Sequence, residues 1–279
     1  MLTLDTNKLS TQEIQQYLQF AIAPRPICFA STIDLEGNVN LSPFSFFNLF
    51  SMNPPICIFS PSRRVRDNTT KHTLENIKEV PECVINIVNY NMVQQVSLSS
   101  CDYPKGTNEF TKAGFTELAS ELVRPPRVAE SPIQLECIVQ EVIELGTQAG
   151  AGNLVLAEIK KIHLHESILD ANQHIDQAKL DLVARLGGDW YARITENNLF
   201  KVEKPNTKLG IGFDQLPKEI KEGSLFTANE KAQLANTNLL PVLNPESKLN
   251  LSSEKITEIK AALAHNNTEL AWEIIQTSI

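Results

Sequence analysis

The segment "RPICFASTIDLEGNVNLSPFSFFNLFSMNPPICIFS", residues 25–60, decides the fold class. In its first part Ile27, Phe29 and Ile33 alternate with smaller or polar side chains, which is the pattern of a half-buried strand. The sequence "DLEGN" follows and is typical of a turn, so residues 26–46 are predicted to form a β-hairpin. "PPICIFS" then adds a short, continuously apolar strand. This stretch therefore predicts an antiparallel β structure.

Further strand patterns follow along the chain. "ECVINIVN" is continuously apolar, and apolar and polar side chains alternate in "SPIQLECIV". In "GNLVLAEIKKIHLHES" the alternation changes parity near Lys160 and Lys161, which predicts a β-bulge. Candidate helices lie between the strands, over Thr69–Lys78 and, one or two of them, across 90–114. We therefore predict a mainly β fold with helices, and the absence of G-x-G-x-x-G after a strand argues against a Rossmann domain.

The chain changes character after "RLGGDWYARI". Residues 1–200 form the predicted β-rich domain, whereas residues 201–226 contain prolines and glycines with little periodicity and are predicted to be an extended linker. Residues 227–279 are predicted to be a small C-terminal helical appendage. Its signals are three expected N-caps: a capping box formed by Thr227 and Glu230, then Ser252 and Thr268.

Composition narrows the class of protein. The 279 residues carry a formal net charge of −8, which argues against a nucleic-acid-binding surface. No apolar run approaches the roughly 20 residues of a membrane-spanning helix, and no signal peptide is visible, so we expect a cytoplasmic protein without membrane contact. The cysteines are scattered and odd in number, and we expect reduced thiols that act as small core side chains: Cys28, Cys57, Cys83, Cys101 and Cys137.

Positive charge is concentrated in "SPSRRVRDNTTKHTLEN", residues 60–76. The stretch leaves a strand and enters a helix that we expect to begin near Asn68, Thr69 or Thr70. A helix N-terminus with nearby basic groups favours an anion such as phosphate, and only Asp67 competes for the basic side chains within the stretch. Spacing alone leaves a second interpretation open, in which the stretch is a solvated basic loop.

A second unusual segment, "NLSPFSFFNLFSMNPPICIFS", combines a polar cluster with phenylalanines and a Pro-Pro pair. We expect the backbone to leave sheet geometry around residues 43–49, where exposed main-chain groups could meet a planar ligand. The alternative is an aromatic turn in the core of a barrel.

Several segments, taken together and in order, resemble the flavin reductase-like, FMN-binding split-barrel family that includes the flavoredoxins. They are the segment 25–60 together with "KHTLEN", "ECVINIVN", "DYPKGTNEF", "RVAESPIQLEC", "GAGNLVLAEI" and "RLGGDWY". The resemblance spans about residues 18–195. It implies a six-stranded Greek-key split β-barrel, a homodimer with FMN at or near the subunit interface, and hydride transfer from a reduced nicotinamide to flavin N5.

The resemblance also implies site residues. Ser45, Phe46 and Asn48 are expected to line the isoalloxazine, largely through main-chain groups. The phosphate is expected to be held by Ser60, Arg66, Thr69, Thr70 and Lys71. Where family members often have K-D-T-x-x-N, this chain has His72 in place of the acid, and its preceding loop is longer. No catalytic side chain is expected because the flavin supplies the reactive atom. No metal site is expected either, since His163 and His165 lack an evident third ligand.

Two functions from different classes remain open. The first is an FMN-dependent oxidoreductase that takes hydride from NADH or NADPH and passes electrons to free flavin, a ferric complex or a partner protein. The alternative is a non-catalytic FMN-binding or electron-carrier protein whose helical tail recruits a partner. The sequence favours the first through the family resemblance.

Overall fold

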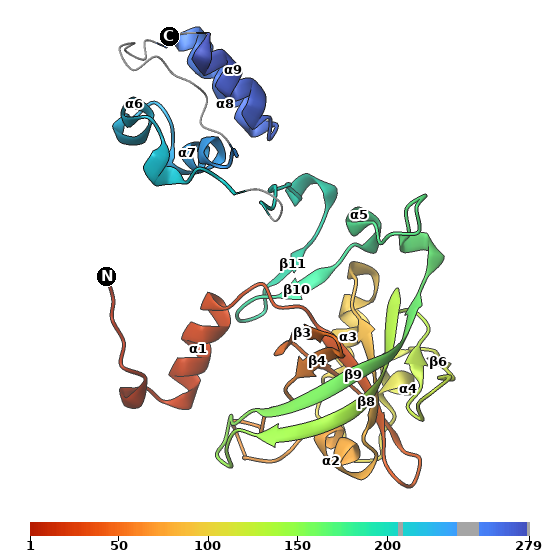
Figure 1. Cartoon of the computed structure of the whole chain (residues 1–279). Coiled ribbons are helices and arrows are strands. Elements are labelled where there is room, and N and C mark those ends of the chain that lie inside the picture. Colours follow the sequence, from red (N-terminus) through yellow and green to blue (C-terminus); the bar gives the residue numbers. More distant parts are fainter. Residues whose placement is uncertain (206–208, 239–250, 278–279) are drawn as a thin grey trace. The chain divides into compact units, whose positions relative to one another are not determined.

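The computed structural model describes residues 1–205, 209–238 and 251–277, and the chain divides into two compact units. The first unit spans Met1–Leu199 and the second Phe200–Ile279 (Figure 1). The boundary between the two units lies within one residue of residue 200, the predicted end of the β-rich domain. Each unit is described by itself.

The first unit is built on one antiparallel sheet with the strand order β2-β1-β5-β8-β9-β4-β3. The strands are β1 (Cys28–Ile33), β2 (Val39–Phe44), β3 (Phe47–Met52), β4 (Pro55–Phe59), β5 (Glu82–Ile87), β8 (Ile133–Glu144) and β9 (Asn153–Leu164). Only residues 45 and 46 separate β2 from β3, yet these two strands form opposite edges of the sheet. The sheet must therefore curve round on itself, as a barrel does.

The predicted hairpin and bulge are both confirmed. β1 pairs with β2 across the "DLEGN" turn. In the β8–β9 pairing Glu136 faces Lys161 while Cys137 faces Ile159, so Lys160 is the extra residue of a bulge. The sheet has seven strands where six were expected. The difference arises because the chain leaves sheet geometry only at residues 45 and 46, a much shorter break than the expected 43–49.

Short elements surround the sheet. The helices of this unit are α1 (Thr11–Ala21), α2 (His72–Glu79), α3 (Val93–Ser99), α4 (Glu109–Ala113) and α5 (Gln177–Leu180). The short strands are β6 (Glu117–Leu118), β7 (Arg127–Val128), β10 (Val183–Arg185) and β11 (Tyr191–Arg193). Where one or two helices were expected across 90–114, the structure has two, α3 and α4. The prediction for α2 was wrong at its start: the N-cap is Lys71, without a side-chain capping bond, because Thr69 and Thr70 are engaged elsewhere in the loop.

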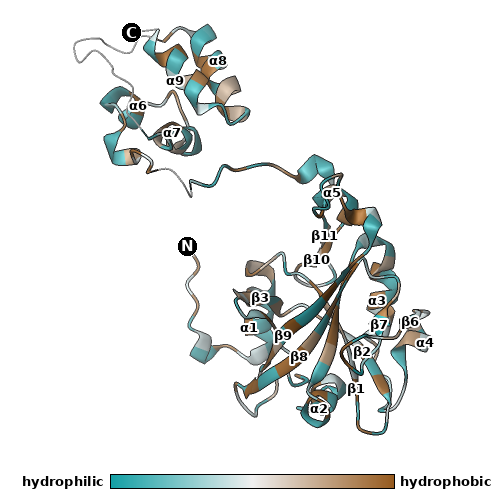
Figure 2. Ribbon diagram, turned by 45° about the vertical axis from the view of Figure 1, so that its right-hand side comes forward, coloured by the Kyte–Doolittle hydropathy of each residue, from teal (hydrophilic) through white to brown (hydrophobic). Residues whose placement is uncertain are grey.

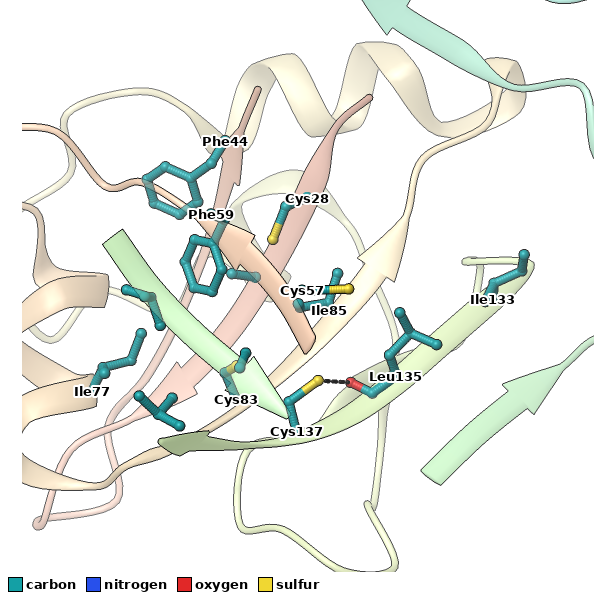
Figure 3. Close-up of a cluster of buried hydrophobic side chains, with 14 of the residues drawn as sticks. Cys28, Phe44, Cys57, Phe59, Ile77, Cys83, Ile85, Ile133, Leu135 and Cys137 are labelled. Carbon is teal, nitrogen blue, oxygen red and sulfur yellow. Dashed lines mark hydrogen bonds between the residues drawn. The ribbon is translucent and has the colours of Figure 1, made fainter. Parts of the chain in front are cut away.

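The barrel core is apolar and includes most of the thiols (Figure 3). Cys28, Cys57, Cys83 and Cys137 are buried, as predicted, and pack with Phe44, Phe59, Ile77 and Ile85. Cys101 is exposed and lies outside this core, contrary to the expectation for all five thiols. Figure 2 shows hydrophobic residues along the strands that form the core.

The second unit is a helical cluster with its own apolar core. It contains α6 (Lys218–Glu222), α7 (Ala228–Ala235), α8 (Ser253–Ala264) and α9 (Thr268–Gln276). Buried Leu216, Ile220 and Phe226 join this core, so the expectation of an extended linker over 201–226 was wrong for its second half. The reason is that these apolar residues bury against α7, α8 and α9. Residues 206–208 and 239–250, which belong to the predicted linker and appendage, lie outside the described residues.

The helix starts of the second unit largely follow the sequence signals. Thr227 and Glu230 form the predicted capping box, and Ser252 caps α8. α9 is capped by Asn267, one residue before the predicted Thr268, since the Asn267 side chain accepts from the Leu270 N–H. No helix within the described ranges is long and apolar enough to cross a membrane.

Candidate functional site

A cavity of about 700 Å³ lies in the first unit between α1 and the loop that joins β4 to α2. This volume suits a small-molecule ligand. One wall is formed by one face of α1 and by its C-cap residue Ile22; the residues of this wall are Thr11, Ile14, Gln15, Leu18, Gln19 and Ile22. The other wall consists of Arg25, Phe46, residues 62–66, Lys71, Asp102 and Gly150. A wall with the apolar side chains of Ile14, Leu18 and Ile22 thus stands opposite a basic loop.

Lys71 is a cation of this cavity that is available to a ligand. Its ammonium group makes no hydrogen bond or ion pair with any residue that the structure describes. Burial, followed by the neighbouring charge of Arg64, lowers the pKa of Lys71. A half-buried, unpaired ammonium group gains most from an anionic ligand, because the ligand replaces the water that the group has lost.

The arginines of the loop are partly engaged within the protein. Arg64 donates to the Thr69 hydroxyl at 2.9 Å and also to the Thr70 carbonyl oxygen. Arg66 contacts Asp67 at 3.1 Å and Asp102 at 2.5 Å. These hydrogen bonds raise the pKa of Arg66. A ligand at these side chains competes with existing partners.

Two carboxylates compete for the basic groups. The prediction named only Asp67, whose pKa is held well below its usual range by the Thr69 hydroxyl and N–H and then by Arg66. Asp102, which follows α3, was missed. Burial alone would raise the pKa of Asp102, but the hydrogen bond from Arg66 and the positive charges of Arg66, Lys71 and Arg64 together outweigh burial and lower it. Asp67 and Asp102 therefore offset the charges of Arg64 and Arg66, whereas Arg63 bonds only to neutral oxygens of Asn68 and Lys71 has no partner among the described residues.

The structure brings together only some of the predicted residues. Phe46, Arg66 and Lys71 line the cavity. Ser60 is buried and accepts from the Asn153 N–H at 3.0 Å, so it holds the loop against β9. The Thr69 hydroxyl donates to Asp67 within the loop, and the Thr70 hydroxyl donates to Glu75 in the first turn of α2. The side chains of Ser45 and Asn48 are not among the cavity lining, and the Asn48 amide oxygen accepts from the Leu49 N–H.

Thr73 and Asn76, which follow Lys71 in α2, fix the position of Lys71 through hydrogen bonds on the side of α2 that faces the sheet. Thr73 donates to Asn40 at 2.6 Å, and Asn76 donates to Thr32 at 3.2 Å, both in buried surroundings. Buried Glu109 accepts from Asn40 at 3.0 Å and completes this network. These bonds tie α2 to β1 and β2, so Thr73 and Asn76 position Lys71 without lining the cavity.

Two features of the cavity were missed in the sequence. The first is α1, which has no buried residue, although the capping box of Ser10 and Glu13 signals its start. The second is Arg25, which donates at 2.6 Å to the carbonyl oxygens of Gln19 and Ile22 and so caps the end of α1. The Arg25 guanidinium also lies 6.0 Å from the centre of the Phe46 ring. The buried Arg25 Nε has no partner among the described residues.

Comparisons with known proteins identify the family of this chain. The model of the flavin reductase like domain matches residues 20–179. The chain belongs to the flavin reductase-like family. The uncharacterized protein BH2278 of Halalkalibacterium halodurans is 35% identical to this chain over 204 residues, which cover 72% of this chain and 96% of BH2278.

Solved structures of the flavin reductase-like family share the fold. Nitrilotriacetate monooxygenase component B from Bacillus cereus is 28% identical and has a TM-score of 0.67, with 72% of this chain and 98% of that chain covered. A flavin reductase-type protein with split barrel domain from Shewanella frigidimarina is 25% identical, with a TM-score of 0.61 and coverage of 71% and 95%. The predicted split-barrel fold is thus confirmed. The chain that contains this cavity belongs to a flavin-binding family.

The two histidines considered as metal ligands have other partners. His163 lies 2.7 Å from Glu136, and His165 contacts Ser167. Across the ranges that the structure describes, no group of three or more His, Cys, Asp or Glu side chains is arranged to hold a metal ion.

Proposed function

We propose that this chain is an FMN-dependent oxidoreductase, in which FMN binds in the cavity between α1 and the basic loop and receives hydride from NADH or NADPH. The observation that carries the proposal is Lys71: a half-buried ammonium group without a protein partner, at the wall of a cavity whose opposite wall is apolar. A planar ring with a phosphate group matches both halves of this cavity.

The residues of the chain bind and orient this ligand. Lys71 neutralises the phosphate, while Arg64 and Arg66 add donors at the cost of weakening their bonds to Asp102. The Phe46 ring and the apolar stripe of α1 cover the ring system and exclude water. Bound flavin supplies the hydride acceptor, so the protein contributes position and electrostatics.

We further propose that the protein is a cytoplasmic homodimer. β3 is an edge strand, and its Phe50 and Met52 side chains are 65% and 77% exposed. α1, which lies beside β3 in Figures 1 and 2, adds exposed Leu18 and Ile22. An open sheet edge with apolar side chains is a liability unless it is covered, and a second copy of the chain is the cover we propose. The electrons are proposed to pass to free flavin, a ferric complex or a partner protein.

The test is an anaerobic titration of the FMN-loaded protein with NADH and NADPH. We expect loss of the yellow flavin absorbance with at least one of them, followed by its recovery when air or a ferric complex is added. FMN that binds but is reduced by neither nucleotide would refute the oxidoreductase and support the electron-carrier alternative. Failure to bind FMN at all would refute both.

A further inference from the structure

A second groove, of about 400 Å³, lies in the first unit between α3 and the β10–β11 hairpin. Its walls carry two arginine–tyrosine pairs. The Arg193 guanidinium lies 3.7 Å from the centre of the Tyr90 ring, and that of Arg185 lies 4.6 Å from the centre of the Tyr191 ring. We call this site the tyrosine groove. The β10–β11 hairpin begins after residue 179, where the match to the family model ends.

The two arginines of the tyrosine groove differ in their charge balance. Arg193 makes a bidentate pair with Asp181, at 2.8 and 2.9 Å, so its charge is neutralised within the protein. Arg185 donates to the Trp190 carbonyl oxygen at 3.2 Å and has no carboxylate partner in the part of the chain that the structure describes. Arg185 is therefore the group that can receive a ligand phosphate, since its guanidinium keeps free donors.

The tyrosines supply the complementary apolar surface. Tyr90 and Tyr191 are both exposed in the groove. Aromatic rings beside guanidinium groups are the surfaces on which nucleobases stack. Asp189 also lines the groove. Its carboxylate would repel a phosphate but can accept hydrogen bonds from ribose hydroxyls. These groups together match a nucleoside phosphate.

We call the cavity between α1 and the basic loop the flavin cavity. One backbone bridge joins it to the tyrosine groove. Arg25 and Arg185 exchange two main-chain hydrogen bonds, at 2.9 and 2.8 Å. Arg25 lines the flavin cavity and Arg185 lines the tyrosine groove. The two sites therefore flank the same pair of residues, and a ligand with two halves can extend from one site toward the other.

We propose that the tyrosine groove binds the adenosine phosphate half of a dinucleotide whose other half enters the flavin cavity. This inference rests on the proposed function, because it takes the dinucleotide to be either the reduced nicotinamide donor or FAD. Arg185 contacts the phosphate, and the adenine stacks on the Tyr191 or Tyr90 ring, on the face that the guanidinium group does not cover.

The first experiment needs no flavin chemistry. Titration of the full chain with 5′-AMP and with adenosine is followed by tryptophan fluorescence, because Trp190 is 71% exposed next to groove residues whereas Trp272 is buried in the second unit. We expect saturable binding of 5′-AMP. Arg185→Gln should weaken 5′-AMP about tenfold and leave adenosine unchanged, because one charge-assisted bond is lost. Lys160→Gln is the matched control, since it removes an exposed charge outside both sites.

Tyr191→Leu distinguishes stacking from charge. It should weaken 5′-AMP and adenosine alike, by about fivefold or more, because both carry the base. The inference is overturned if 5′-AMP does not bind the wild-type chain, or if Arg185→Gln and Lys160→Gln bind it equally well. These readouts stand even if the flavin proposal fails.

The second experiment identifies the source of the adenosine phosphate. If it belongs to the donor, Arg185→Gln should raise the KM for NADH or NADPH but not for reduced nicotinamide mononucleotide, which lacks the adenosine half. If it belongs to FAD, Arg185→Gln should weaken FAD and not FMN. Either result supports the groove assignment. Arg185→Gln would contradict it by affecting NADH or NADPH no more than reduced nicotinamide mononucleotide and, at the same time, FAD no more than FMN.

Discussion

Replacing Lys71 with alanine should weaken FMN far more than replacing Arg66. Lys71 has no partner among the described residues, so its bond to phosphate would be a net gain of about 1.5–3 kcal/mol. Its loss should reduce FMN affinity by roughly tenfold to a hundredfold. The Arg66 side chain is 63% exposed and already pairs with Asp67 and Asp102. A new partner only exchanges for these, so Arg66→Ala should cost well under about 1 kcal/mol, or less than about fivefold in affinity.

A third variant, Asp102→Asn, should increase FMN affinity instead of lowering it. Asp102→Asn removes the carboxylate that holds Arg64 and Arg66, and it should tighten FMN binding by a few fold. All three variants should bind riboflavin as the wild type does, because riboflavin lacks the phosphate. The assay is a fluorescence titration of each variant with FMN and with riboflavin. Equal weakening of the two ligands by Lys71→Ala, or a larger loss from Arg66→Ala than from Lys71→Ala, would refute the assignment of the phosphate to Lys71.

The other predictions concern pH, thiols, assembly and the fold. Burial lowers the pKa of Lys71, so its ammonium group loses its proton at a lower pH than an ordinary lysine does. As the pH is raised, FMN affinity should therefore start to decrease before an ordinary lysine would titrate, whereas Lys71→Arg should show no such decrease. A thiol reagent should modify Cys101 alone in the native protein and the other four cysteines only in denaturant, since those thiols are buried and burial raises the pKa of Cys57 to about 11. If the proposed dimer forms through this edge, Met52→Asp should convert it to a monomer in light scattering, because the substitution places a charge on the exposed edge strand. Glu136→Gln should lower the free energy of unfolding at pH 7 by about 2 kcal/mol or more in urea titrations, because fully buried Glu136 accepts three backbone N–H bonds.

The Glu136 prediction also has a pH dependence. Burial acts to raise the pKa of this carboxyl, but the hydrogen bonds from the Glu121 and Leu122 N–H groups, from His163 and from the Val123 N–H together outweigh burial and lower it. A carboxyl with a lowered pKa stabilises the fold above its unfolded-state pKa, and it loses that effect as the pH falls through the lower folded-state value. The stability difference between the wild type and Glu136→Gln should therefore shrink in acid. A constant difference at every pH would contradict the role given to the ionised carboxylate.

The strands could be predicted because their side chains record the burial of each face. The alternation around Lys160 even located the bulge, since a single inserted residue shifts every later side chain to the other face. α1 was not predicted for the converse reason: none of its residues is buried in the described chain. Its apolar side chains Ile14 and Leu18 line the cavity, so the periodic pattern marks a cavity wall and not a core.

The candidate site was harder to predict because its charges are balanced across distant segments. Asp102 pairs with Arg66 but stands far from it in sequence, and no pattern within the basic stretch signals this partner. Likewise Thr69 and Thr70 carry the hydroxyls that a phosphate site needs, yet both donate to nearby acids. Residue type was sufficient to find the loop. Which group keeps a free charge depends on contacts that only the fold creates.

Positive charge is concentrated in residues 60–76 of an acidic chain for two separate reasons. Most of it organises the loop: Arg63 binds the Asn68 side chain and carbonyl oxygen, and Arg64 holds Thr69 and Thr70. These internal bonds fix the backbone that leads to Lys71, whose helix is anchored from behind by Thr73 and Asn76. A loop that is ordered before the ligand arrives loses less conformational entropy on binding. In the proposed phosphate site the arginines would therefore act mainly by holding Lys71 in place, which is why we expect one unpaired lysine to outweigh a neighbouring, more exposed arginine.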